Sequence, residues 1–83
     1  PEPAEPILEM TLFPNPASEY VTVVFPETQL PEVLQIINMN GQVIDSYEVS
    51  SSSVSIRVAW LSSGVYLMHA VRSNESLPFF VQE

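Results

Sequence analysis

The chain has 83 residues, which is enough for one small domain, and its 46% of hydrophobic residues suffice for one modest core. Ten acidic residues against two basic ones give a formal net charge of -8, so repulsion disfavours nucleic acid and anionic membrane surfaces as partners. Cysteine is absent, which excludes disulfides and thiolate chemistry, and no apolar run reaches the ~20 residues of a membrane-spanning helix.

The first residues of the chain have the composition of a linker. The stretch "PEPAEP" alternates proline with small or acidic residues, which is typical of extended, solvated segments that cannot pack. We therefore interpret residues 1–8 as a linker to an upstream domain and residues 9–83 as the folded domain.

The rest of the chain consists of short runs in which apolar and polar residues alternate with a period of two. No window holds a sustained period of 3.6 residues, so helices are not predicted. The predicted strands are residues 9–13, 20–25, 33–39, 42–49, 53–59, 65–72 and 77–82. Strands of this number and spacing predict an all-β fold, a seven-stranded antiparallel immunoglobulin-like β-sandwich.

Alternation also indicates which residues face the core, because successive side chains of a strand point to opposite faces of the sheet. The predicted inward residues are Val21, Val23, Phe25, Leu34, Ile36, Val54, Ile56, Val58, Tyr66, Met68 and Ala70. Trp60, just after a predicted strand, is expected to close one end of the core. Of the adjacent Phe79 and Phe80, one is expected in the core, and the other is a candidate partner contact. The alternative is that both sides of this strand are covered within the chain.

Two turns are predicted from their residue types. Asn40-Gly41 lies between two apolar runs, which predicts a two-residue hairpin loop with positive φ at both positions. In "FPNPAS", residues 13–18, Pro14 and Pro16 lack amide donors and fix φ, so they are expected to end the first strand.

No arrangement of polar residues predicts catalysis. His69 is the only histidine, and without cysteine it cannot assemble a zinc or nucleophile site within this chain. No serine lies in a G-x-S-x-G elbow, and the carboxylates lack the spacing of a calcium loop. We therefore expect no enzymatic activity, no metal site and no cofactor.

Four stretches, read together, carry a family resemblance: "LFPNPASEYVTVVF", "LQIINMNGQVI", "LSSGVYLMHAV" and "FFVQE". In this order and spacing the chain resembles the C-terminal sorting domain of proteins exported by the type IX (Por) secretion system of Bacteroidetes. The matching residues are Phe13, Pro14, Asn15, Pro16, Asn38, Gly41, Gln42, Gly64, Tyr66, Phe80 and Val81. Many members carry one or two lysines around the Phe-Val pair, whereas Phe79 and Gln82 flank it here.

The resemblance implies a secretion signal. Such a domain directs its precursor through the periplasm and the type IX machinery to the outer-membrane surface or the medium. The implied partners are the outer-membrane secretion machinery and a sortase-like peptidase, which usually removes the domain. Because the last predicted strand holds one proline and no charge, its edge is also expected to allow self-association.

Two other functions are compatible with the same fold. A fibronectin-like or immunoglobulin-like adhesion or carbohydrate-binding module at the end of a secreted protein is favoured by rows of exposed aromatic residues. Few are predicted here, namely Tyr20, Tyr47 and one of Phe79 and Phe80. A structural spacer is the third function considered, and it predicts unchanged export when the domain is deleted.

Overall fold

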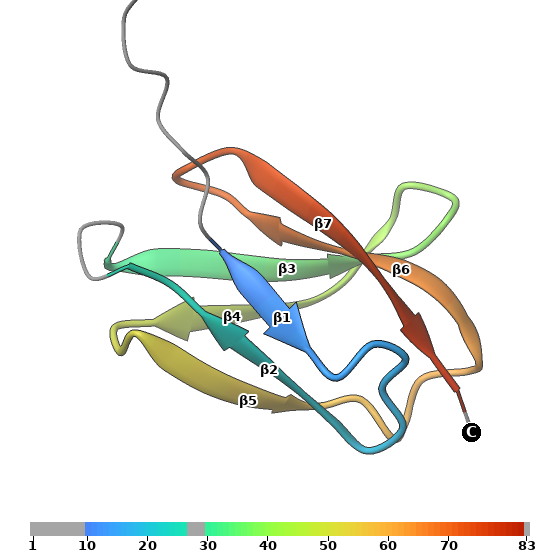
Figure 1. The fold of residues 1–83 in the computed structure, drawn as a ribbon. Helices are drawn as coiled ribbons and strands as arrows, with labels where there is room; N and C mark the ends of the chain where they lie inside the picture. Colours follow the sequence, from blue (N-terminus) through green and yellow to red (C-terminus); the bar gives the residue numbers. More distant parts are fainter. Residues whose placement is uncertain (1–9, 27–29, 83) are drawn as a thin grey trace, which may run out of the picture.

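The computed structural model describes residues 10–26 and 30–82, which form seven β-strands in two sheets (Figure 1). The strands are β1 (Thr11–Phe13), β2 (Tyr20–Val24), β3 (Glu32–Ile37), β4 (Val43–Val49), β5 (Ser53–Arg57), β6 (Gly64–Ala70) and β7 (Glu75–Val81). One sheet has the order β1-β2-β5 and the other β4-β3-β6-β7, with every pair antiparallel. The predicted all-β antiparallel sandwich is confirmed. The predicted linker lies outside the described residues.

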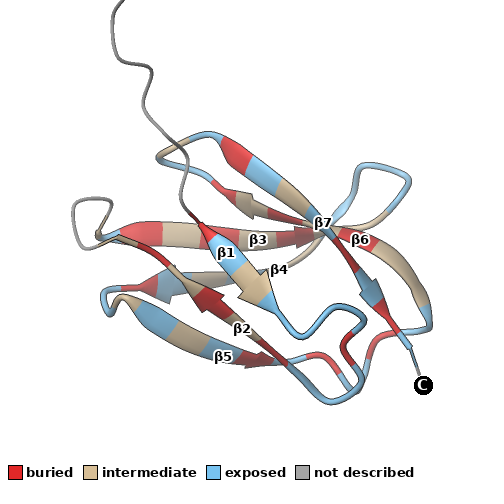
Figure 2. Ribbon diagram, in the orientation of Figure 1, coloured by how far each residue is buried: buried red, intermediate tan, exposed pale blue. Residues whose placement is uncertain are grey.

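The core lies between the two sheets and is built from alternate residues of the strands (Figure 2). The predicted inward residues are buried, except that Val54 is partly buried and packs against the core. Leu34, Ile36 and Met68 are fully inaccessible to solvent. Period-two hydrophobicity therefore identified the buried face of each of these strands correctly.

The two adjacent phenylalanines near the end of the chain face opposite sides of β7. Phe79 is 1% exposed and its ring centroid lies 5.9 Å from that of Tyr66, whereas Phe80 is 53% exposed. This division confirms the prediction that one of the two rings belongs to the core. It leaves the other as a large apolar side chain on the surface.

The predicted position of Trp60 is wrong. Its indole is 51% exposed, and its Nε1–H donates a hydrogen bond of 2.9 Å to the carbonyl of Arg57. The indole is therefore held against the turn that follows β5, and the buried position next to it in the sequence belongs to Leu61. Because a tryptophan N–H needs an acceptor, this turn carbonyl offers the indole a site that the closed core does not.

Tyr47 was predicted to face outward, but it is partly buried and packs against the core. Its hydroxyl donates a hydrogen bond of 2.9 Å to Oδ2 of Asp45. Burial, this hydrogen bond and the charge of the Asp45 carboxylate raise the pKa of Tyr47 to about 12. Tyr47 is therefore a neutral core residue and not an exposed aromatic platform.

Asn38 and Gln42 close the hairpin between β3 and β4, so its loop has three residues, 39–41, and not the predicted two. The N–H of Asn38 donates to the carbonyl of Gln42 at 2.9 Å, and the N–H of Gly41 donates to the carbonyl of Asn38 at 3.0 Å. Gly41 has a φ of 84°, and among the described residues only Asn74 is a non-glycine with positive φ. The predicted positive φ of Asn40 is therefore wrong, and the loop is a turn followed by a left-handed glycine.

The side chain of Asn38 explains this loop. Its Oδ1 accepts hydrogen bonds from the backbone N–H of Asn40 at 2.9 Å and of Gln42 at 3.0 Å. Its Nδ2 donates to Oε1 of Gln42 at 3.0 Å. Because its side chain satisfies two backbone donors, Asn38 holds the chain in the turn. The loop therefore starts at residue 39 and not at Asn40, as predicted.

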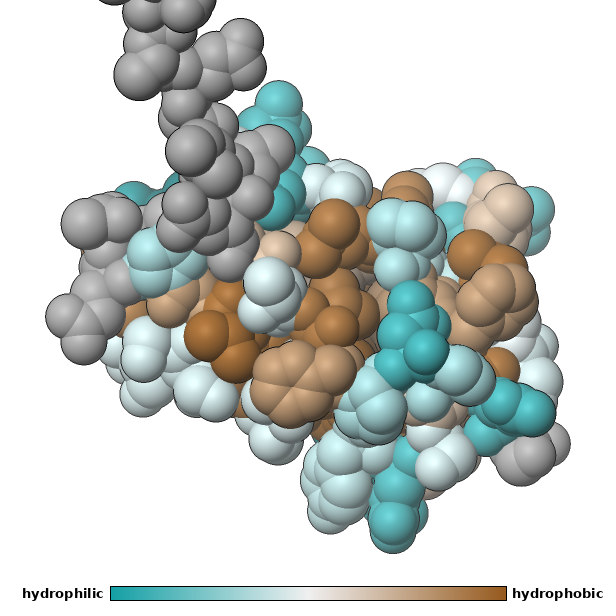
Figure 3. Space-filling model, in the orientation of Figure 1, coloured by the Kyte–Doolittle hydropathy of each residue, from teal (hydrophilic) through white to brown (hydrophobic). Residues whose placement is uncertain are grey.

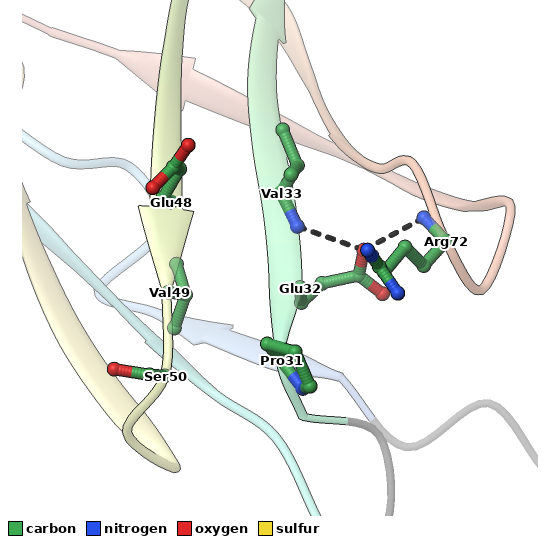
Figure 4. A pocket seen from close by; sticks show the side chains of 7 residues that line it. All are labelled: Pro31, Glu32, Val33, Glu48, Val49, Ser50 and Arg72. Atoms are coloured by element: carbon green, nitrogen blue, oxygen red, sulfur yellow. Dashed lines mark hydrogen bonds between the residues drawn. The ribbon is translucent and has the colours of Figure 1, made fainter.

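A buried carboxylate ties β3 to the turn between β6 and β7. Glu32 is 1% exposed, and its Oε1 accepts hydrogen bonds from the N–H of Val33 at 2.9 Å and of Arg72 at 2.7 Å (Figure 4). Its Oε2 accepts from the N–H of Ser73 at 3.1 Å and from the Oγ of Ser73 at 3.0 Å. Burial acts to raise the pKa of Glu32, but these hydrogen bonds outweigh it and lower the pKa below 4.5.

Replacing Glu32 by glutamine is expected to lower the free energy of unfolding by about 1–3 kcal/mol at pH 7, because buried amide donors lose an acceptor. Since the folded-state pKa is below 4.5, the stabilisation is fully present above about pH 4.5 and is lost as the pH falls through the folded-state value. The difference in urea-unfolding free energy between wild type and Glu32→Gln should therefore shrink in acid. Glu48→Gln, which removes an exposed charge on β4, is the control, and its unfolding free energy should stay close to that of wild type.

Replacing Asn38 by alanine is expected to lower the free energy of unfolding by about 1 kcal/mol or more, because two backbone donors of the turn lose their acceptor. Asn40→Ala, in the same exposed loop, should change it by less than about 0.5 kcal/mol. Thermal unfolding of both variants measures the difference. Equal effects would show that the Asn38 side chain does not hold the turn.

Candidate functional site

Three of the four stretches that carry the resemblance meet at one end of the sandwich. Gly64 at the start of β6 is paired with Val81 at the end of β7, and Ala17 forms a parallel bridge with the same Val81. Figure 1 shows the end of β7 near the connection between β1 and β2. The fold thus brings together residues that are far apart in the sequence.

Hydrogen bonds fix the segment Asn15–Ala17, here named the clamp segment, to the end of β7. The N–H of Phe80 donates to Oδ1 of Asn15 at 2.9 Å. The N–H of Ala17 donates to the carbonyl of Phe80 at 2.8 Å, and the N–H of Gln82 donates to the carbonyl of Ala17 at 2.8 Å. Ala17 itself is fully buried. The "FPNPAS" stretch therefore ends β1 at Phe13, as predicted, and then docks onto the last strand.

The clamp segment changes the interpretation of the β7 edge. Phe80 and Gln82 direct their backbone groups away from β6, and the clamp segment already occupies them. The backbone of Pro78 also points away from β6, because alternate residues of an antiparallel strand form hydrogen bonds to the same side. Proline has no N–H to donate at this edge. The edge that the sequence suggested to be open is therefore largely protected.

Exposed apolar side chains surround this junction. Phe13 is 52% exposed and Phe80 53%, and the rings of Pro14 and Pro16 are also exposed. A groove, here named the end groove, is lined by Pro16, Ser63, Gly64, Phe80, Val81 and Gln82. Its lining contains no charged side chain, so the end groove is suited to an apolar contact.

Other motif residues at this end have structural positions. Tyr66 is 8% exposed, and its hydroxyl donates a hydrogen bond of 2.7 Å to the carbonyl of Ser62. Val81 is 2% exposed. Gly64 has a φ of 156°, a conformation that side-chain-bearing residues rarely adopt, although a Cβ there would meet no neighbouring atom. These residues shape the entry into β6 and the end of β7.

The remaining motif residues lie elsewhere. Asn38, Gly41 and Gln42 belong to the β3–β4 hairpin and do not line the end groove. Their hydrogen bonds form the turn, which is a structural reason for these residue types at these positions. Of the eleven predicted site residues, Pro16, Gly64, Phe80 and Val81 therefore line the end groove, whereas Asn38, Gly41 and Gln42 form the hairpin.

A second hollow lies beside Glu32, between β3, β4 and the turn after β6 (Figure 4). Because the Glu32 carboxylate already accepts four hydrogen bonds and its pKa is lowered, it is a structural group and not a proton donor. Residues 10–26 and 30–82 contain no group of three or more histidine, aspartate or glutamate side chains placed to hold a metal ion. Nor does this part of the chain contain a helix long and apolar enough to cross a membrane.

A family model described as the secretion system C-terminal sorting domain matches residues 11–78, which is most of the chain. No curated protein and no solved structure matches the chain. The match covers β1 to β6 and the first part of β7, including the clamp segment, the hairpin and Gly64. Domains of this family are sorting signals and not catalysts, which fits the apolar end groove. The chain belongs to the family of secretion system C-terminal sorting domains, which mark proteins of Bacteroidetes for export by type IX secretion to the cell surface or the medium.

Proposed function

We propose that the folded domain is read by the outer-membrane secretion machinery at the end where the clamp segment meets β7. The precursor first enters the periplasm, and the machinery then binds the end groove together with Phe13 and Phe80. The observation that carries this proposal is that four of the motif residues, Pro16, Gly64, Phe80 and Val81, line one apolar groove.

Phe80 is the main contact in this proposal. Exposed aromatic residues often dominate the energy of protein interfaces, because they bury a large area with few rotatable bonds. The backbone N–H and carbonyl of Phe80 are held by Asn15 and Ala17, and its chain neighbours Phe79 and Val81 are paired with β6. Binding would therefore cost little conformational entropy, because the backbone that carries the ring is already ordered.

We further propose that a sortase-like peptidase removes the domain by cleaving in the linker, residues 1–8. Proline-rich, acidic segments stay solvated and extended, which is the form in which proteases take their substrates. The cleavage would release the cargo at the surface or into the medium and leave the sandwich intact.

Self-association through the last strand stays a prediction, and the clamp segment limits how it could occur. Without displacing that segment, a second copy finds outward backbone groups only near Ser76 and the carbonyl of Pro78. Such a short stretch provides few hydrogen bonds. We therefore propose that the domain meets the machinery as a monomer.

A reporter carrying a periplasm-directing leader, fused in front of residues 1–83, tests the proposed function in a type IX-competent bacterium. We expect the reporter outside the cells, with a mass that lacks the domain. Phe80→Ser should lower the exported fraction strongly, while Tyr20→Ser, which truncates another half-exposed aromatic on β2, should not. A folded reporter retained in the periplasm, or equal export of both variants, would contradict the proposal.

Asn15 is expected to act through the position of Phe80. Asn15→Ala should lower the free energy of unfolding by about 1 kcal/mol, because the Phe80 amide loses its acceptor, and should reduce export in parallel. Asn15→Asp keeps an acceptor oxygen and should preserve more of both. Normal thermal unfolding of Asn15→Ala combined with lost export would instead show that Asn15 itself contacts the machinery.

A further inference from the structure

Apolar side chains continue from Phe80 across the outer face of the four-stranded sheet. The register places Val65 opposite Phe80, and Leu67 opposite both Pro78 and Ile37. Ile37 in turn lies opposite Val43 of β4. These residues, here named the apolar stripe, come from all four strands: Val43, Ile37, Val65, Leu67, Pro78 and Phe80.

The apolar stripe faces away from the core. Its chain neighbours Ile36, Met68 and Phe79 are buried between the sheets, so the residues next to them point outward. Val43 is 50% exposed and Phe80 53%, and Pro78 is exposed as well. The described residues therefore leave this face of the sheet without a covering layer. The hydrophobic side chains visible in the view of Figure 3 show that apolar surface is not confined to the interior.

The row next to the apolar stripe is polar. Gln35 lies opposite Ser46 on one side and His69 on the other, and His69 lies opposite Ser76. Nδ1 of His69 and Oγ of Ser76 are 2.8 Å apart and share a hydrogen bond. Apolar and polar residues are thus segregated along the strands, and the apolar row lies on the side of Gly64 and Phe80. An apolar row across four strands is more than scattered exposure.

We propose that the apolar stripe is a docking surface for a component of the secretion machinery that presents an apolar patch bordered by basic residues. This inference rests on the proposed function and extends its contact area from Phe80 across β6 and β3 to β4. The stripe contains no charged residue, while the chain carries a net charge of -8. A partner with a basic border is therefore attracted to the domain, and its apolar centre meets the stripe.

A second copy of this chain fits the surface less well. Two stripes placed face to face would bring together two domains that each carry a charge of -8. Glu48 lies on the same outer face of β4, opposite Val33, so each copy would bring a carboxylate toward the other. The partner is therefore a protein of opposite charge and not another copy.

Val43→Lys tests the proposal with a matched control, Ser46→Lys, which adds the same charge on the same strand and the same face but in the polar row. In the reporter assay, Val43→Lys should lower the exported fraction by about tenfold or more, while Ser46→Lys should leave it near wild type. Thermal unfolding of the purified 83-residue chain shows whether both variants fold. If Val43→Lys is unstable, Val43→Thr, which replaces a methyl group by a hydroxyl, should still lower export.

Other outcomes separate this inference from the proposed function. If the wild-type fusion is not exported, the proposed function fails. If the wild type and Phe80→Ser behave as expected but folded Val43→Lys or Val43→Thr is exported like wild type, only the apolar stripe is refuted. Sedimentation velocity of the purified chain tests the second copy as the occupant. A dimer that Val43→Lys dissociates would overturn the assignment to the secretion machinery.

Discussion

The attachment of Asn15–Ala17 to the end of β7 is the interaction on which the rest of this structure depends. It joins the connection between β1 and β2, which belong to one sheet, to β7, the edge strand of the other sheet. The backbone groups of β7 that it binds would otherwise remain unpaired. Ala17 is fully buried at this point. Because two of its three hydrogen bonds join backbone to backbone, the contact fixes where the neighbouring side chains emerge.

This arrangement explains why the predicted site residues look unrelated along the sequence. Asn38 and Gly41 shape a hairpin, Gly64 and Tyr66 shape the entry into β6, and none of them presents a reactive group. Phe13 and Phe80 instead lie on the surface. The pattern therefore combines residues that form the sandwich with residues that are exposed on its surface.

The strands and their inward faces could be predicted because alternation is a local property of the chain. Glu32 shares the phase of Leu34 and Ile36, which was a signal for its burial, but its acceptor role depends on a turn 40 residues away. Asn15 likewise finds its donor 65 residues along the chain. Contacts over such separations are set by the packing of the sheets, so no local pattern predicts them.

Trp60 also shows that a local sequence pattern cannot predict which side chains tertiary structure buries. Its hydrophobicity suggested burial, yet a carbonyl three residues earlier binds its indole N–H and Leu61 takes the core position. Composition thus indicated how much apolar surface the domain has, and tertiary structure decided which part of it stays outside. The apolar stripe on the outer face of the four-stranded sheet belongs to the part that stays outside.

The pairing of the clamp segment with β7 also makes this end of the domain depend on the order in which the chain is synthesised. Asn15 and Ala17 leave the ribosome long before Phe80 and Gln82, so they cannot dock until β7 exists. A chain that stops before Phe80 lacks both the aromatic ring and the strand that positions the "FPNPAS" turn. The end groove therefore forms only after the ribosome has passed Gln82.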